Sequence, residues 1–188
     1  MQSSGLYVDS VLQAGRHRYT AYPSLGQASS GKGDSVLASV EAGTSLPIAA
    51  GWAVEPQLQI AYQHLGLDDT AISGAAIQQD TDGGWVVRAG VRVKGSFDAG
   101  AGTLQPYARV NLYERSSGTD ITRFIGPAGS TDIASSTGGS SGELALGATW
   151  QLSQGASIYG ELGQLWDLGG DARTSSGVNA SLGVKVLW

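Results

Sequence analysis

Six charged residues give this sequence its candidate for polar chemistry inside a fold. Each lies in a segment where polar and apolar residues alternate: Glu55, Arg88, Arg92, Arg109, Glu143 and Glu161. Both signs are present, so the side chains can neutralise one another if they share one face of a sheet. A buried charge without a partner is strongly destabilising, which predicts a network of salt bridges. The alternative is a polar conduit, which needs a wider fold.

A second set of residues could in principle support nucleophilic catalysis. Its members are His17, His64, Asp68, Asp69, Ser24, Ser29 and Ser30. A hydroxyl becomes a strong nucleophile beside a base that a third group orients. No spacing here enforces that contact, and Ser and Asp are common in loops because they form turns. We therefore predict that the chain is not an enzyme. Two distant histidines make no metal motif and no phosphate-binding loop is present, so we expect no cofactor.

The elements that must position the charges are eight strands. The expected segments are residues 5–22, 35–47, 51–65, 84–95, 103–115, 142–152, 155–168 and 176–188. Their connections alternate between short and long, as in an up-and-down transmembrane barrel with short periplasmic turns and long extracellular loops. A Greek-key sandwich does not impose this alternation. We predict an all-β fold: an antiparallel, up-and-down, eight-stranded transmembrane β-barrel in which the last strand pairs with the first.

The longest connection, residues 116–141, contains a turn signal at residues 126–129. Residues 120–125 and 130–134 flank this turn and alternate weakly. We interpret the region as a hairpin whose strands continue beyond the membrane. The alternatives are a further spanning pair, which would give ten strands, or a place within a twelve-stranded barrel.

The alternation assigns each strand an apolar face for lipid and a polar face for the lumen. All five tryptophans fall on the apolar face near strand ends: Trp52, Trp150 and Trp188 at the periplasmic end, Trp85 and Trp166 at the extracellular end. Aromatic girdles of this kind mark membrane–water interfaces. Pro56 and Pro106 also point outward, and each removes a ladder hydrogen bond, which predicts a local bulge.

Composition limits the remaining possibilities. The 188 residues suffice for a single domain, residues 1–188, and the net charge of −5 argues against a nucleic-acid partner. There is no cysteine, which excludes a disulfide framework. No apolar run is long enough for a transmembrane helix, and residues 1–5 lack the features of a signal peptide.

Several segments resemble the C-terminal translocator barrel of classical autotransporters, the type Va secretion proteins. They are residues 5–9, 12–13, 39–43, 52–62, 88–92, 104–113, 142–147, 157–159 and 183–188, of which 52–62 is the most specific. The resemblance runs in order along nearly the whole chain. It implies a location in the outer membrane of a Gram-negative bacterium and a passenger domain in the full-length parent. It also implies twelve strands and a plugging helix, whereas we count eight strands, equivalent to the family's last eight.

Two functions follow from the resemblance. The first is that of a translocator that anchors and exports a passenger, with the alternative that a shortened barrel is inactive in transport. The second is that of a small structural or adhesive barrel acting through its extracellular loops. We expect a monomer in contact with outer-membrane lipid and lipopolysaccharide.

The segment from Val178 to Trp188 has the cleanest alternation in the sequence. In the resembling family, a terminal strand that ends in an aromatic residue is recognised by the barrel-assembly machinery. An unpaired strand edge can be bound by addition of a further strand. The resemblance therefore implies that Val184, Val186 and Trp188 form an assembly signal.

Overall fold

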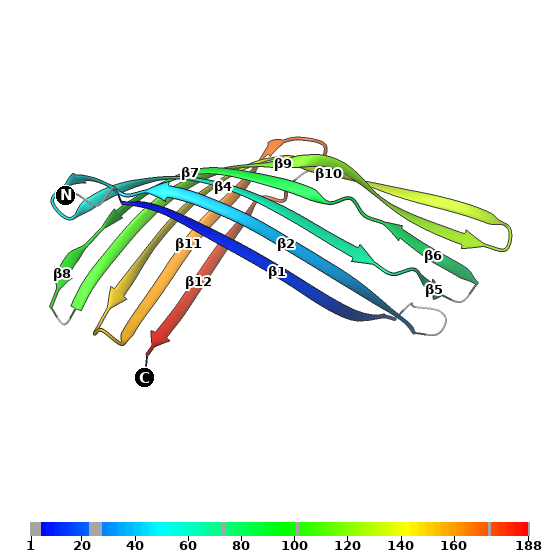
Figure 1. Cartoon of the computed structure of the whole chain (residues 1–188), viewed down its shortest axis with the longest axis horizontal. Coiled ribbons are helices and arrows are strands. Elements are labelled where there is room, and N and C mark those ends of the chain that lie inside the picture. The colour runs from blue at the N-terminus through cyan, green and yellow to red at the C-terminus, as the bar shows by residue number, and fades with distance from the viewer. Residues whose placement is uncertain (1–4, 23–27, 73, 101, 173, 188) are drawn as a thin grey trace.

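The computed structural model describes residues 5–22, 28–72, 74–100, 102–172 and 174–187, and within these ranges every regular element is a β-strand (Figure 1). Eight strands are long: β1 (Leu6–Ala21), β2 (Ser29–Thr44), β4 (Trp52–Leu67), β7 (Gly84–Gly95), β9 (Gly102–Gly126), β10 (Gly129–Gln151), β11 (Ala156–Gly169) and β12 (Gly177–Val186). Four are short: β3 (Leu46–Ala49), β5 (Thr70–Ile72), β6 (Ala75–Asp80) and β8 (Phe97–Ala99). The predicted all-β antiparallel class is confirmed.

The long strands form one antiparallel sheet in the order β1-β2-β4-β7-β9-β10-β11-β12, so each pairs with its sequence neighbour among the long strands. The sheet is strongly staggered. Tyr7, the second residue of β1, connects through successive ladder partners to Gly177, the first residue of β12. Because the chain enters β1 and β12 from opposite ends of the sheet, this path crosses its full height. Such a stagger accompanies the inclined strands of a barrel wall.

The sheet is a curled half-barrel rather than a closed eight-stranded barrel (Figure 1). Among the described residues β12 pairs only with β11, and β1 only with β2. The prediction that the last strand pairs with the first is therefore wrong for this structure. Alternation along a strand determines which side chains face inward, but it does not determine how sharply neighbouring strands turn relative to one another. Two edges consequently present backbone groups without strand partners.

Two of the short strands arise from prolines. The β2–β4 ladder ends at Gln57, and the ladder of β3 with β4 begins at Val54, which leaves Pro56 between them. Pro106 lies likewise between the ladders that β7 and β8 form with β9. Proline has no N–H to donate, so the ladder is interrupted at each site. The expected bulges are absent from both positions, because the same register resumes beyond each gap.

The opposite end of the sheet, where the connections are long, is extended by further strands. β9 and β10 continue as a paired hairpin well beyond the other strands, as predicted, and β6 adds to β9 with β5 beside it (Figure 1). The hairpin leaves the sheet at register shifts on β10 near Gly138, where a φ of 98° suits glycine. Its Arg123 donates two hydrogen bonds to Asp132, of 2.7 and 2.8 Å, and these hold the pKa of the Asp132 carboxyl below its ordinary value. This segment therefore continues β9 and β10 and does not add the further spanning pair of the ten-strand alternative.

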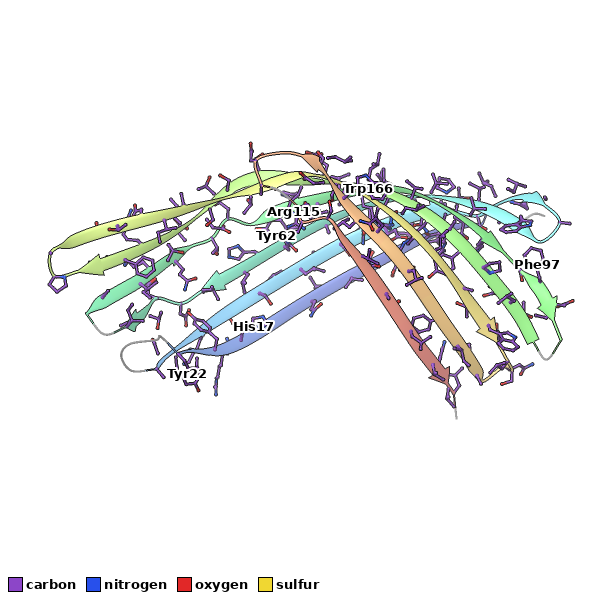
Figure 2. All side chains as sticks on the ribbon, turned by 180° about the vertical axis from the view of Figure 1, so that it is seen from behind. His17, Tyr22, Tyr62, Phe97, Arg115 and Trp166 are labelled. Carbon is purple, nitrogen blue, oxygen red and sulfur yellow. The ribbon has the colours of Figure 1, made fainter. Side chains whose placement is uncertain are left out.

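The interior of the sheet is polar, and its exterior is apolar. Among described residues the one fully buried apolar side chain is Ala145, whereas Glu55, Asn111 and Glu143 are buried. Large apolar side chains are exposed on every long strand, including Leu12, Leu58, Leu112 and Leu162. Side chains project from both surfaces of the sheet along its whole length (Figure 2). This inverted distribution suits a wall with hydrocarbon outside it.

Inward-pointing tyrosine rings lie over glycines of neighbouring strands. A Cβ added to Gly147 would come within 2.4 Å of the Tyr107 ring and 2.9 Å of the Gly160 carbonyl oxygen. Gly147 is opposite Tyr107 in the β9–β10 ladder. The missing side chain therefore makes room for the ring that reaches Glu161.

We expect Gly147→Ala to displace Tyr107 and to lower the free energy of unfolding by about 1–3 kcal/mol, the usual range for overpacking. Denaturant unfolding in detergent micelles measures the change. Gly160→Ala is the matched control, because its added Cβ would meet Leu182 and Ser181 at ordinary contact distances of 3.6 and 3.9 Å. Equal losses in the two variants would contradict the role of the Tyr107–Gly147 contact.

Candidate functional site

The concave face carries a polar network in three parts, of which the first is centred on Arg88 of β7. Its Nη2 donates to Glu41 Oε2 at 2.6 Å, its Nη1 to Asn111 Oδ1 at 3.0 Å, and its Nε to Gln59 Oε1 at 3.0 Å. The Tyr7 hydroxyl donates to Glu41 Oε1 at 2.9 Å. The three acceptors lie on β2, β9 and β4. The guanidinium of β7 therefore joins four strands.

The second part is centred on the Glu55 carboxylate of β4, which is 2% exposed. Arg92 and Lys94 of β7 both form ion pairs with Glu55. Both lie on the polar face of β7, because residues two apart on a strand share a face. Two cations on one carboxylate compensate its removal from water.

The third part is centred on Arg109 of β9. Its Nη2 donates to Glu143 Oε1 at 3.2 Å and to Glu161 Oε1 at 2.9 Å. The Tyr107 hydroxyl donates to Glu161 Oε2 at 2.6 Å, and the Tyr113 hydroxyl to Glu143 Oε2 at 2.7 Å. Asn111 also donates to Glu143, at 2.7 Å, and therefore links this part to Arg88.

The stagger and curl of the sheet explain why these residues meet. Glu41 and Arg88 lie on strands separated by β4, and Arg109 and Glu161 on strands separated by β10. A strand's second neighbour comes within reach only on the concave side of a curled sheet. Four carboxylates and four cations make up these ion pairs, so the network is balanced in charge.

The six predicted charges thus lie on one face, but with partners that the sequence did not specify. Arg88 pairs with Glu41 rather than with Glu55, Glu143 or Glu161. Glu41 was missed although it alternates with Val40 and Ala42, the pattern that identified the other carboxylates. Lys94, Asn111 and the tyrosines complete the network, and their roles as partners required knowledge of the register between strands.

In the described part of the chain, the residues considered for catalysis form no hydrogen-bonded set of serine, histidine and aspartate, although His17 and Asp68 line one depression. His17 Nε2 lies 2.8 Å from Ser35 Oγ, near the loop end of β1 (Figure 2). Ser29 is hydrogen bonded to Thr70, and Asp69 accepts from Gln78. His64 and Asp68 belong to β4 and the residues after it, Ser30 contacts Thr20, and Ser24 lies outside the described residues. No group of three potential metal ligands occurs in the ranges that the structure describes.

The tryptophans lie near strand ends. Trp52 begins β4 and contacts Phe97 edge-on at 5.3 Å, and Trp150 is next to the last residue of β10. At the loop end, Trp85 contacts Tyr62 at 5.0 Å between ring centroids, and Trp166 is the fourth residue from the end of β11 (Figure 2). Of the expected assembly signal, Val184 and Val186 are exposed on β12, and Trp188 lies outside the described residues.

Comparison with known proteins relates these features to a family. The model of a family described as the autotransporter beta-domain matches residues 1–163. The pertactin autotransporter of Bordetella bronchiseptica is 31% identical over 163 residues, which cover 84% of this chain and 17% of that protein. The pertactin autotransporter of Bordetella parapertussis is 30% identical over 163 residues, which again cover 84% of this chain and 17% of that protein. The chain thus spans about 17% of the length of the curated relatives it matches. Within the described residues, no helix has the length and apolarity needed to cross a membrane.

We expect Arg109→Leu to lower the free energy of unfolding by about 1–3 kcal/mol. The substitution leaves Glu143 without one partner and Glu161 with Tyr107 as its remaining donor, and removing one member of a buried pair is more costly than losing an exposed pair. Urea unfolding in detergent micelles provides the measurement.

Arg123→Leu is the matched control, because Arg123 is on the same strand and forms a salt bridge with side chains about half exposed. Its effect should stay below about 1 kcal/mol. An Arg109→Leu protein as stable as the control would show that the third part of the network contributes nothing to folding.

Proposed function

We propose that this chain, which belongs to the autotransporter beta-domain family, supplies eight membrane strands to the wall of a translocator through which a passenger is exported. The family's location is the Gram-negative outer membrane. The observation that carries the proposal is the sheet itself, with a polar concave face, an apolar convex face and two free edges.

The free edges favour a wall that further strands complete. In hydrocarbon each unpaired backbone group is strongly destabilising, so an open edge cannot remain in lipid. The curl of the eight long strands leaves β1 and β12 apart. Additional strands between β1 and β12 would satisfy both edges and would enclose a lumen wider than that of an eight-stranded barrel.

The chemistry of the concave face supports passage of a polypeptide. Eight of its charges form ion pairs with one another, and Tyr7, Gln57, Tyr107 and Tyr113 are hydrogen bonded within this network. Charges that are paired in this way are not free to hold an unfolded segment. Such a lining can therefore be passed without a strong binding step. The passenger, as a partner, is proposed from the names of the relatives.

The assembly machinery is proposed as a second partner, through β12. This strand has one unpaired edge and an outer row of exposed apolar side chains that includes Val178, Leu182, Val184 and Val186. Strand addition to such an edge supplies main-chain hydrogen bonds together with contacts to alternate side chains. In this proposal the chain acts as a monomer, and Trp188 lies with Trp52 and Trp150 in the girdle at the turn end.

We expect a reporter fused upstream, within the full-length protein, to become accessible to protease added outside intact cells. Deleting residues 5–187 should abolish this exposure, because the export path is lost. The control is a full-length protein lacking residues 119–137, the outer part of the β9–β10 hairpin, which lies beyond the polar lining. A reporter that stays in the periplasm while the sheet inserts normally would favour the alternative, a structural or adhesive barrel that acts through its loops.

We expect Trp188→Ala to reduce insertion into the outer membrane of cells several-fold while leaving refolding in detergent nearly unchanged, because no machinery is needed in detergent. The measurement compares the heat-modifiable, folded fraction in both settings. Leu187→Ala is the control, since Leu187 breaks the outward alternation of the strand. Equal losses in cells and in detergent would make Trp188 a packing residue instead.

A further inference from the structure

Three cations form an outward-facing cluster on the first two strands, at their loop end. Arg16 and Arg18 lie on β1 and Lys32 on β2, and all three side chains are exposed. In the β1–β2 ladder, Arg18 is opposite Lys32, and Arg16 is opposite Asp34. The cluster therefore occupies two adjacent rungs of one face, and a shallow depression includes it together with Asp34 and Asp68.

The cluster lies on the convex face, in contrast to the ion-paired charges of the concave network. Arg16 and Arg18 alternate with His17 and Tyr19, and Tyr19 accepts a hydrogen bond on the concave side from Gln79. Four other cations of the long strands, Arg88, Arg92, Lys94 and Arg109, form ion pairs in the concave network. Arg16, Arg18 and Lys32 instead project from the convex face of the sheet.

The cluster begins where the apolar surface of the wall ends. Below it on the same face, the outward residues of β1 are Leu6, Val8, Ser10, Leu12 and Ala14, followed by Arg16. Arg16 follows Leu6 ten positions later, which is about the length of a strand that crosses a bilayer. Val36 and Val40 continue the apolar surface on β2. The cations thus lie at the outer boundary of the hydrocarbon region.

The cluster is only partly neutralised from within the protein. Arg16 Nε lies 3.3 Å from Asp34 Oδ1, but the two side chains are 93% and 71% exposed, so this ion pair is weak. Among the described residues Arg18 and Lys32 have no salt bridge, and Asp68 contributes a backbone hydrogen bond to the carbonyl of Lys32. The hydroxyls of Thr20 and Ser30, one rung further out, lie 3.2 Å apart and add hydrogen-bond donors.

We infer that Arg16, Arg18 and Lys32 bind the phosphate groups of lipopolysaccharide in the outer leaflet. An amphiphile with acyl chains and an anionic head matches this surface in both parts, since its chains cover Leu12, Ala14 and Val36 while its phosphates reach the guanidinium and ammonium groups. Guanidinium groups bind phosphate oxygens in pairs of hydrogen bonds. Free phosphate would meet the cations but would leave the apolar surface below them uncovered. The inference rests on the proposed membrane placement of the wall.

The test compares the full-length protein with its R16Q/R18Q/K32Q variant, both extracted from outer membranes in mild detergent. We expect the lipopolysaccharide retained per protein molecule after gel filtration to fall, by roughly fivefold for each cation removed at low salt. Lys185→Gln, which removes a cation from β12, is the control and should retain the normal amount. Vesicles that contain lipopolysaccharide with or without its lipid A phosphates supply a second readout: the unmodified protein should prefer the phosphorylated vesicles, and the variant should not.

Retention of equal lipopolysaccharide by the variant would overturn the inference, as would equal preference for vesicles lacking the phosphates. Displacement of lipopolysaccharide by millimolar inorganic phosphate would overturn it as well, in favour of a site for free anions. The protease-accessible reporter separates this result from the function proposed above. Exposure should be normal in the variant, so loss of lipid binding with intact export supports the inference, whereas failure of export in the unmodified protein concerns the translocator alone.

Discussion

The backbone hydrogen bond is the interaction on which this structure depends. A chain surrounded by hydrocarbon must pair every N–H and C=O within the protein, and strands do so only with neighbours on both sides. Seven ladders between the long strands meet this requirement in the interior of the sheet. The prolines show the effect of one missing N–H donor. Pro56 and Pro106 each split a neighbouring strand in two without altering its register.

Once the backbone is paired, the side chains are left with two very different surroundings. Period-two alternation sends Leu58 and Ile60 outward and Gln57 and Gln59 inward. The buried carboxylates Glu55 and Glu143 are each paired with cations, and the inward polar network takes the place of an apolar core. Its bonds join strands that do not touch through their backbones, so the network also fixes the curl of the sheet. Arg88 and Arg109 are the central donors, and each spans an intervening strand.

Much of this arrangement follows from the sequence. The bounds of β1, β4, β7, β11 and β12 agree with the expected segments within two residues, because each carries a clear alternation between turn residues. β2 begins six residues earlier than expected, at Ser29, because its loop-end residues are small and polar and show no alternation. The prediction that Arg88, Arg92 and Arg109 share a face with Glu55, Glu143 and Glu161 needed alternation alone. The pairing of Arg88 with Glu41 could not be predicted in the same way, since it depends on the register of three strands and on curvature.

The prediction that the last strand pairs with the first was wrong for a related reason. An alternating strand looks the same in a barrel of any size, because the number of strands and their stagger are properties of the sheet and not of one strand. The short and long connections identify the two ends of the wall, and the convex cations at Arg16 and Lys32 lie at one of them. The curvature of the sheet, in contrast, depends on contacts between strands. At Tyr107 and Gly147 a large side chain is accommodated by the absence of another on the adjacent strand. Tyr7 with Gly43 and Tyr159 with Gly183 repeat this arrangement, so the same packing extends to the strands at both free edges.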